Sequence, residues 1–151
     1  MDAWEPEVDR PAAVVIGIGS PLRRDDAVGH AVVDALAACD LEDVELVSVH
    51  QLTPEVAAVC AGRRRVVFVD AAVDTDELSV SELSTDASGR LLTHHLGAAG
   101  LLGLAAGLGW APAAANLVRI PVSDLGIGTG LSPATEALVP VAVERIVALL
   151  A

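Results

Sequence analysis

Short apolar runs alternate with longer amphipathic segments along this chain. Residues 12–18 and 65–69 are near-continuous apolar runs rich in Val, and Gly, Pro or charged residues bound them. Such runs are typical of strands that are covered on both faces of a sheet. Between them, residues 25–39 repeat apolar side chains at helical spacing and place two acidic residues in the first turn. The pattern therefore predicts strands that alternate with helices.

Further strands and helices follow from the same patterns. The strands are predicted at residues 44–49, 78–83 and 116–122. The looser alternation of residues 78–83 is typical of an edge strand. The helices are predicted at residues 53–60, at about residues 93–108 and from Ser132 onward. A Ser or Thr followed by Pro begins the first and the last of these helices, which places an N-cap residue before a first-turn proline.

Strands and helices in this order predict an α/β fold. We expect a three-layer α/β/α sandwich of the phosphorylase/hydrolase-like kind, with a twisted, mainly parallel sheet of about five strands. Residues 1–11 are acidic and lack the alternating pattern, so a flexible N-terminal segment is predicted before a single domain over residues 12–151. A chain of 151 residues buries roughly 70% of its unfolded surface, which is enough for a full core.

The charge of the chain argues against several classes of partner. The net charge is -12, from 21 Asp and Glu against 9 Lys and Arg. Nucleic acid and anionic membranes would be repelled by this charge. An aromatic content of 2% also leaves few rings on which bases could stack. We therefore expect neither a nucleic acid nor a membrane as partner.

Three further features bear on the cellular location. Residues 91–118 carry no formal charge, but repeated glycines and Pro112 interrupt them, which favours a buried helix over a membrane span. The acidic N-terminus lacks the basic and apolar regions of a secretory signal. Cys39 and Cys60 have no disulfide or zinc spacing, so both are predicted as core residues of a cytoplasmic protein.

Polar residues follow the first predicted strand, where an open α/β sheet binds its ligands. Residues 17–29 begin with Gly-x-Gly and carry Asp25 and Asp26 at a helix start. Leu22 stands where a dinucleotide-binding loop would need its third glycine, and a P-loop lysine is missing. The two carboxylates therefore either cap and complement the helix or belong to another kind of site.

Two more polar residues stand at strand or helix ends. Asp70 ends the strand at residues 65–69, and His94 stands at the start of the helix predicted from about residue 93. Asp70 could simply cap a turn, and a histidine in apolar surroundings often just finds a core partner. At a helix N-terminus, however, the dipole disfavours protonated imidazole and leaves a neutral metal ligand. Asp26, Asp70 and His94 at one sheet edge would suit nickel, zinc or iron with open coordination positions.

In order along the chain, four motifs resemble those of the nickel-iron hydrogenase maturation endopeptidases. They are Gly17-x-Gly19-Ser20-x-Leu22-x-x-Asp25-Asp26-x-x-Gly29, the strand-terminal Asp70, Thr93-His94-His95 and Gly130-Leu131-Ser132-Pro133. The likeness runs from about residue 13 to residue 150, and its first motif is the most specific. It implies a twisted sheet between helices. It also implies a cytoplasmic protease that removes a C-terminal extension from the hydrogenase large-subunit precursor after nickel insertion.

The resemblance also assigns roles to residues. It places the nickel-contacting acid on Asp26, the second acid on Asp70 and the histidine on His94, so these three are the predicted catalytic and metal-contacting residues. Some relatives have Glu where this chain has Asp26. The Asp side chain is one methylene shorter than Glu but keeps the carboxylate. His95 is the alternative to His94, because a shift of one residue in register would exchange them.

The implied metal is nickel that the precursor carries, with no permanently bound cofactor in the protease. The cation would polarise the scissile carbonyl while a carboxylate, with Asp26 as one candidate, orients or deprotonates water. His50, after the second strand, either borders the cleft or faces solvent. The expected partner is the large-subunit precursor, and the protein itself is expected to be a monomer.

Two alternatives from other functional classes stay open. One is a non-catalytic nickel-docking or chaperone module for hydrogenase assembly on the same scaffold. The other is a small-molecule phosphorylase or hydrolase, which would need an anion cradle. Arg23 and Arg24 are the only basic residues beside the candidate site that could form one. The ordered motifs favour the protease, because an α/β architecture alone hosts many functions.

Overall fold

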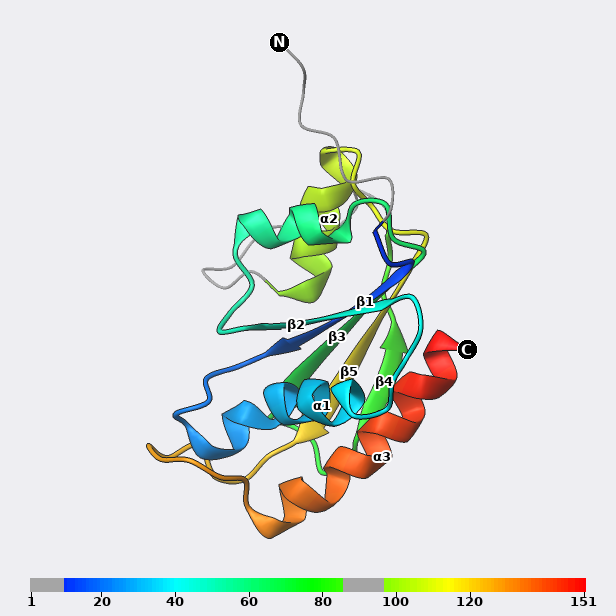
Figure 1. The fold of residues 1–151 in the computed structure, drawn as a ribbon. Coiled ribbons are helices and arrows are strands. Elements are labelled where there is room, and N and C mark those ends of the chain that lie inside the picture. The colour runs from blue at the N-terminus through cyan, green and yellow to red at the C-terminus, as the bar shows by residue number, and fades with distance from the viewer. Residues whose placement is uncertain (1–9, 86–96) are drawn as a thin grey trace.

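The computed structural model describes residues 10–85 and 97–151, which form a five-stranded sheet between two layers of helices (Figure 1). The strands are β1 (Ala13–Ile18), β2 (Val44–Val49), β3 (Arg65–Ala72), β4 (Ser79–Glu82) and β5 (Ala114–Pro121). The helices are α1 (Val28–Ala37), α2 (Ala98–Gly107) and α3 (Pro133–Leu150), with two 3-10 helices, η1 (Arg24–Ala27) and η2 (Pro54–Cys60). The predicted α/β fold is confirmed.

Four of the five strands are parallel. The order across the sheet is β2-β1-β3-β5-β4, and β1 pairs in parallel with both β2 and β3, as β3 does with β5. β4 runs antiparallel to β5 at the edge, as its looser alternation predicts. The chain builds outward from β1 to β2 on one side and then to β3 on the other. The strand order therefore reverses between β1 and β3, and ligands of such sheets bind at the carboxyl end of this reversal.

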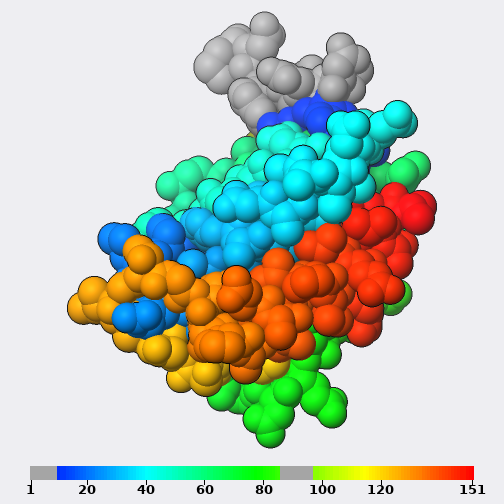
Figure 2. All heavy atoms as spheres, turned by 60° about the horizontal axis from the view of Figure 1, so that its bottom comes forward, coloured from blue at the N-terminus to red at the C-terminus, as the bar shows by residue number. Residues whose placement is uncertain are grey.

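One face of the sheet is covered by α1 and α3, which lie side by side (Figure 2). Val15 of β1 and Val67 and Val69 of β3 point to this face and are fully buried. Val32 of α1 and Ile146 of α3 pack against them and are also fully buried. This layer holds the N-terminus of α1 against the middle of the sheet.

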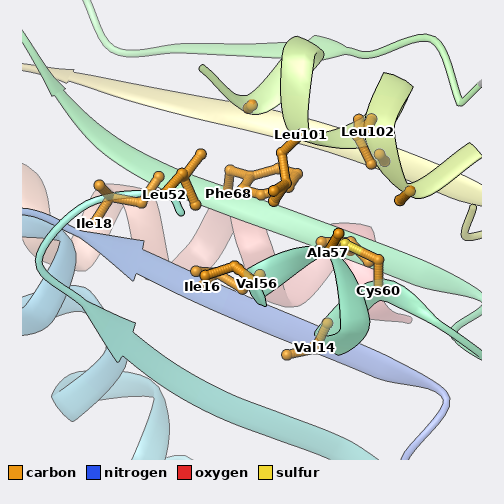
Figure 3. Close-up of a cluster of buried hydrophobic side chains, with 14 residues drawn as sticks. Val14, Ile16, Ile18, Leu52, Val56, Ala57, Cys60, Phe68, Leu101 and Leu102 are labelled. Atoms are coloured by element: carbon orange, nitrogen blue, oxygen red, sulfur yellow. The ribbon is translucent and has the colours of Figure 1, made fainter. Parts of the chain in front are cut away.

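The alternate residues of the same strands form a second core under η2 and α2 (Figure 3). Ile16 and Phe68 from the sheet meet Leu101 and Leu102 from α2, and all four are fully buried. Burying the Phe68 side chain alone stabilises the fold by roughly 2–3 kcal/mol. Because both faces are covered, the central strands read as continuous apolar runs rather than as alternating ones.

The helix boundaries differ from the expectation in two places. The helix predicted at residues 25–39 is divided into η1 and α1, and α1 ends at Ala37. The prediction that Cys39 is a core residue is therefore wrong: Cys39 lies beyond the end of α1 and is exposed, whereas Cys60 is buried. Thr53 occupies the N-cap position of η2 but makes no capping hydrogen bond through its side chain.

The uncharged stretch around α2 packs on the sheet. α2 has 10 residues, and Leu101 and Leu102 are fully buried against the strands. Within residues 10–85 and 97–151, no helix is both long enough and apolar enough to span a bilayer. The start of the predicted helix, at Thr93, lies outside the described residues.

Candidate functional site

The N-terminus of α1 packs directly on the carboxyl ends of β1 and β3. A Cβ atom on Gly29 would lie 2.8 Å from both the Ile18 nitrogen and the Val69 oxygen. A Cβ atom on Gly17 would overlap the carbonyl group of Gly29. Only glycine leaves room for backbones this close. The contact holds α1, and η1 before it, over the reversal in strand order.

Asp26 lies in η1, half-buried, and the loop that leaves β1 holds its carboxylate. The Ser20 N–H donates a hydrogen bond to Asp26 Oδ2 at 2.7 Å. Gly19 has a φ of 141°, and a Cβ atom there would overlap the Asp26 carbonyl oxygen. Among the described residues, no hydrogen bond reaches the second carboxylate oxygen, Oδ1. Asp26 therefore has one oxygen anchored and one available to a ligand.

Asp70 lies near the carboxyl end of β3, which continues past it to Ala72. Burial raises the pKa of the Asp70 carboxyl. The Ala71 N–H donates to Asp70 Oδ1 at 2.9 Å, and this bond lowers the pKa of Asp70. The negative charge of Asp26 raises the same pKa. Burial and the Asp26 charge together outweigh the bond, so the pKa of Asp70 is raised. The fold supports this coupling, because η1, which carries Asp26, is in contact with β3, which carries Asp70.

Arg119 is a neighbour of Asp70 that the sequence patterns do not single out. The two residues pair directly across β3 and β5, and the positive charge of Arg119 lowers the pKa of Asp70. The guanidinium, however, forms its ion pair with Asp74, at 2.5 Å between Nη2 and Oδ1. An arginine in an otherwise apolar strand was the available signal, but only the register shows which residue it faces.

Asp70 lies on the face of the sheet that η2 and α2 cover, because it follows Phe68 at the two-residue repeat of a strand. His94 and His95 precede α2 but lie outside the described residues, so their role as ligands stays a prediction. Across the described part of the chain, no group of three or more His, Cys, Asp or Glu side chains is placed to hold a metal ion.

Two other histidines stand near the carboxyl edge of the sheet. His30 Nε2 lies 3.1 Å from the Val49 carbonyl oxygen, so this ring ties α1 to the end of β2. The sequence patterns do not single out His30, although it directly follows the glycine-rich motif. His50, for which the sequence allows a cleft position or a solvent position, is exposed.

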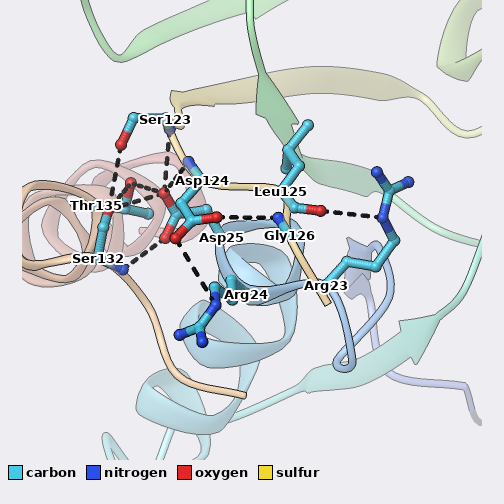
Figure 4. A network of polar contacts seen from close by, with 9 residues as sticks. All are labelled: Arg23, Arg24, Asp25, Ser123, Asp124, Leu125, Gly126, Ser132 and Thr135. Carbon is cyan, nitrogen blue, oxygen red and sulfur yellow. Dashed lines mark hydrogen bonds and ion pairs between the residues drawn. The ribbon is translucent and has the colours of Figure 1, made fainter. Parts of the chain in front are cut away.

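Asp25 is fully buried, in contrast to its neighbour Asp26. Its carboxylate accepts five hydrogen bonds, which Figure 4 shows converging from the β5–α3 loop and the start of α3. The donors are Ser123 N, Asp124 N, Ser132 N, Ser132 Oγ and Thr135 Oγ1. Burial raises the pKa of Asp25, but these bonds outweigh it and hold the pKa well below its usual range. Asp25 is therefore a structural anchor.

The same contacts explain two sequence features. Ser132 occupies the N-cap position of α3, as predicted, but makes no side-chain cap because its hydroxyl donates to Asp25 instead. Arg23 and Arg24, the residues that an anion cradle would need, each contact a different group of the β5–α3 loop rather than forming a shared anion site. Arg23 Nε donates to the Leu125 carbonyl at 3.3 Å, and Arg24 Nε lies 3.7 Å from an Asp124 carboxylate oxygen. This arrangement does not favour the phosphorylase alternative.

Asp26 and Asp70, the carboxylate pair, thus stand on two segments that are in contact at the topological reversal of the sheet. Their mutual repulsion is one reason why the pKa of Asp70 is raised. A divalent cation would relieve this repulsion, and carboxylate oxygens with one imidazole nitrogen are a donor set that nickel accepts. A carboxylate pair with unlike environments also suits acid–base chemistry, because one member can hold a proton while the other is ionised.

No protein-family model and no curated protein matches the sequence. Solved structures do match. The hydrogenase maturating endopeptidase HybD from E. coli superimposes with a TM-score of 0.77 at 25% identity, over 91% of this chain and 91% of that one. The hydrogenase 2 maturation peptidase from Thaumarchaeota archaeon SCGC_AB-539-E09 superimposes with a TM-score of 0.70 at 27% identity, over 91% of this chain and 97% of that one.

A third match extends the likeness of fold to a more distant sequence. The [NiFe] hydrogenase maturation protease HycI from Thermococcus kodakarensis KOD1 has a TM-score of 0.68 at 20% identity, with 91% of each chain covered. Over about 91% of its length, the chain is therefore a structural match to the [NiFe] hydrogenase maturation proteases.

Proposed function

We propose that this protein is a cytoplasmic endopeptidase that removes the C-terminal extension of a nickel-iron hydrogenase large-subunit precursor after nickel insertion. One observation supports the proposal: η1, which carries Asp26, contacts β3, which carries Asp70, at the reversal of a sheet that matches those of hydrogenase maturation proteases. The identities of 25% and 27% to two of these proteases support the assignment.

In this proposal, nickel arrives as part of the substrate. Asp26 and Asp70 each have one oxygen held by a backbone N–H, at 2.7 Å and 2.9 Å, so their remaining oxygens are presented in fixed directions. Precursor-bound nickel docks against these oxygens and against His94. Because the metal completes the contact, a precursor without nickel binds poorly and escapes cleavage.

The carboxylates also supply the chemistry of hydrolysis. Water must lose a proton as it attacks the scissile carbonyl, and the leaving amine must gain one. Asp26, with one oxygen anchored by Ser20, is placed to orient and deprotonate the water. Asp70, whose pKa is raised, is the member of the pair better suited to hold a proton. Nickel on the substrate would polarise the carbonyl.

The test compares nickel-loaded and nickel-free precursor. The purified protein is incubated with each form, and mass spectrometry follows release of the C-terminal peptide. We expect release from the loaded form alone. Equal cleavage of both forms would exclude the nickel checkpoint. Nickel-dependent binding with no peptide release would instead identify a non-catalytic docking module.

A further inference from the structure

Two exposed apolar side chains, Leu22 and Ile127, lie on loops near the carboxylate pair. Leu22 is 62% exposed and Ile127 is 91% exposed. Single exposed apolar residues are normal on a protein surface, whereas a group of them beside a site indicates a binding surface. Five large apolar side chains are exposed among the described residues, and three of them, Leu22, Ile127 and Val73, follow carboxyl ends of the sheet.

The structure joins the two loops through their backbones. The Gly128 N–H donates to the Leu22 carbonyl at 2.9 Å, and the Arg24 N–H donates to the Gly128 carbonyl at 3.2 Å. Ile127 directly precedes Gly128, so its backbone adjoins that of Leu22. In Figure 2 blue atoms of the N-terminal part of the chain lie among orange atoms of the segment that leads into α3. Leu22 and Ile127, both exposed, therefore stand on adjoining backbone segments.

This surface is preorganised. Asp25 ties the two loops together from beneath, because its own N–H donates to the Asp124 carbonyl at 2.9 Å and its carboxylate accepts the N–H groups of Ser123 and Asp124. A binding surface that is already ordered loses little conformational entropy when a partner docks. Exposed apolar groups on so well fixed a loop are suited to receive a partner.

The surface also carries positive charge in a chain with a net charge of -12. Arg23 is exposed, and its Nε donates to a backbone carbonyl, that of Leu125. It forms no ion pair within the described residues. A complementary partner segment would present a carboxylate to Arg23 and apolar side chains to Leu22 and Ile127.

We propose that Leu22, Ile127 and Arg23 form a docking surface for the hydrogenase large-subunit precursor, through a segment of it that carries an apolar side chain next to a carboxylate. The inference rests on the proposed function, because that function supplies the occupant. Asp26, in η1, follows Leu22 by four residues. A precursor held at Leu22 would therefore place its neighbouring part over the carboxylate pair.

The test uses steady-state cleavage of nickel-loaded precursor. Leu22→Ser combined with Ile127→Ser, and separately Arg23→Glu, should each raise KM about tenfold and leave kcat unchanged. The matched control is Leu108→Ser, because Leu108 is 50% exposed just after α2. Melting temperatures should stay at the wild-type value because these side chains are exposed. An unchanged KM, or the same rise in the control, would overturn the proposal.

A binding measurement separates this inference from the proposed function. If the wild-type protein binds loaded precursor without cutting it, the proposed protease activity fails, and weaker binding by the double variant still supports the docking surface. If wild-type and double variant bind loaded precursor equally, the docking surface fails whatever the activity. A wild-type dimer that becomes monomeric in the double variant, with KM unchanged, would assign the surface to self-association and overturn the proposal.

Discussion

At the scale of single residues, Asp25 and Asp26 are consecutive in sequence but belong to different parts of the molecule. Asp25 is fully buried and accepts five hydrogen bonds, whereas Asp26 bonds the loop after β1 and raises the pKa of Asp70. The sequence predicts that a carboxylate pair stands at the carboxyl edge. The resemblance assigns the site role to Asp26, but residue spacing alone does not predict that Asp25 is an anchor, because the donors to Asp25 come from residues about 100 positions later.

Replacement of Asp25 should destabilise the fold. Asp25→Ala leaves part-buried N–H donors and the buried Thr135 hydroxyl without their acceptor, and we expect a loss of roughly 3 kcal/mol in the free energy of unfolding. Urea denaturation measures it. Asp34→Ala, on the exposed side of α1, is the control and should stay within about 0.5 kcal/mol of wild type. A loss no larger than that of the control would show that Asp25 is not an anchor.

The contribution of Asp25 should also depend on pH. Its pKa is held low in the folded protein and has its ordinary value of 3.8 in the unfolded chain. Its stabilising effect is therefore fully present above pH 3.8 and is lost as the pH falls through the folded pKa. The stability difference between wild type and Asp25→Asn should narrow below that pH in urea titrations. A difference that stays constant down to the lowest accessible pH would contradict this account.

Asp70 should behave in the opposite way. Because its pKa is raised on folding, the folded state holds the proton more tightly, and stability falls as the pH rises through the folded pKa. Asp70→Asn removes that loss, so it should raise the melting temperature at pH 7 while abolishing cleavage of the precursor. The gain should vanish at a pH below 3.8, where Asp70 is protonated in both states. An Asp70→Asn variant that is less stable than wild type at pH 7 would refute the raised pKa of Asp70 in the folded protein.

The electrostatic coupling of the two site carboxylates can be measured without a substrate. Asp26→Asn removes a negative charge that raises the pKa of Asp70, so the pKa of Asp70 should fall. A carbon-13 NMR titration of the Asp70 carboxyl reports it directly. Asp34→Asn, on the exposed side of α1, serves as the control and should leave that titration unchanged. An unaltered Asp70 titration in the Asp26 variant would mean that the two groups are too far apart to form one site.

At the scale of elements, the close contact between α1 and the sheet decides where the site lies. Gly29→Ala would push a methyl group to within 2.8 Å of the Ile18 nitrogen and the Val69 oxygen. We expect a loss of roughly 2–3 kcal/mol in stability from this overpacking, together with reduced cleavage because Asp26 moves with the helix. Gly107→Ala in α2 is the matched control, since a Cβ atom there meets nothing within 4 Å. It should be neutral or slightly stabilising. An equal loss of stability in Gly29→Ala and Gly107→Ala would disprove the close contact between α1 and the sheet.

The elements were largely predictable, and their ends were not. Continuous apolar runs gave the positions of β1 and β3 because both faces of these strands are buried. The spacing of apolar residues from position 28 to 36 correctly predicts α1. The same spacing continues to Cys39, so the predicted helix is too long, because α1 ends at Ala37 and Cys39 is exposed. Local spacing carries no information about where a helix leaves the sheet. For the same reason the sequence predicts Ser132 as the N-cap of α3, whereas its hydroxyl donates a hydrogen bond to Asp25.

At the scale of the whole molecule, the topology of the sheet brings the site residues together. Sequence order predicted parallel strands, but the arrangement β2-β1-β3-β5-β4 depends on long-range packing that no local pattern records. The rule that ligands bind at the carboxyl edge nevertheless points to the strand ends where Asp25, Asp26 and Asp70 stand, and the resemblance assigns the site roles to Asp26 and Asp70. Arg119 was missed because its nearness to Asp70 follows from the pairing of β3 with β5.

The anchor at Asp25 has a consequence for the way this protein is made. Its carboxylate closes contacts across 98 to 110 residues of chain, from the first loop to the start of α3. During synthesis, the loop that carries Leu22 and Asp26 cannot reach its final form until Ser132 and Thr135 have left the ribosome. A nascent chain would therefore be unable to engage a hydrogenase precursor, and competence to bind would appear only late in translation.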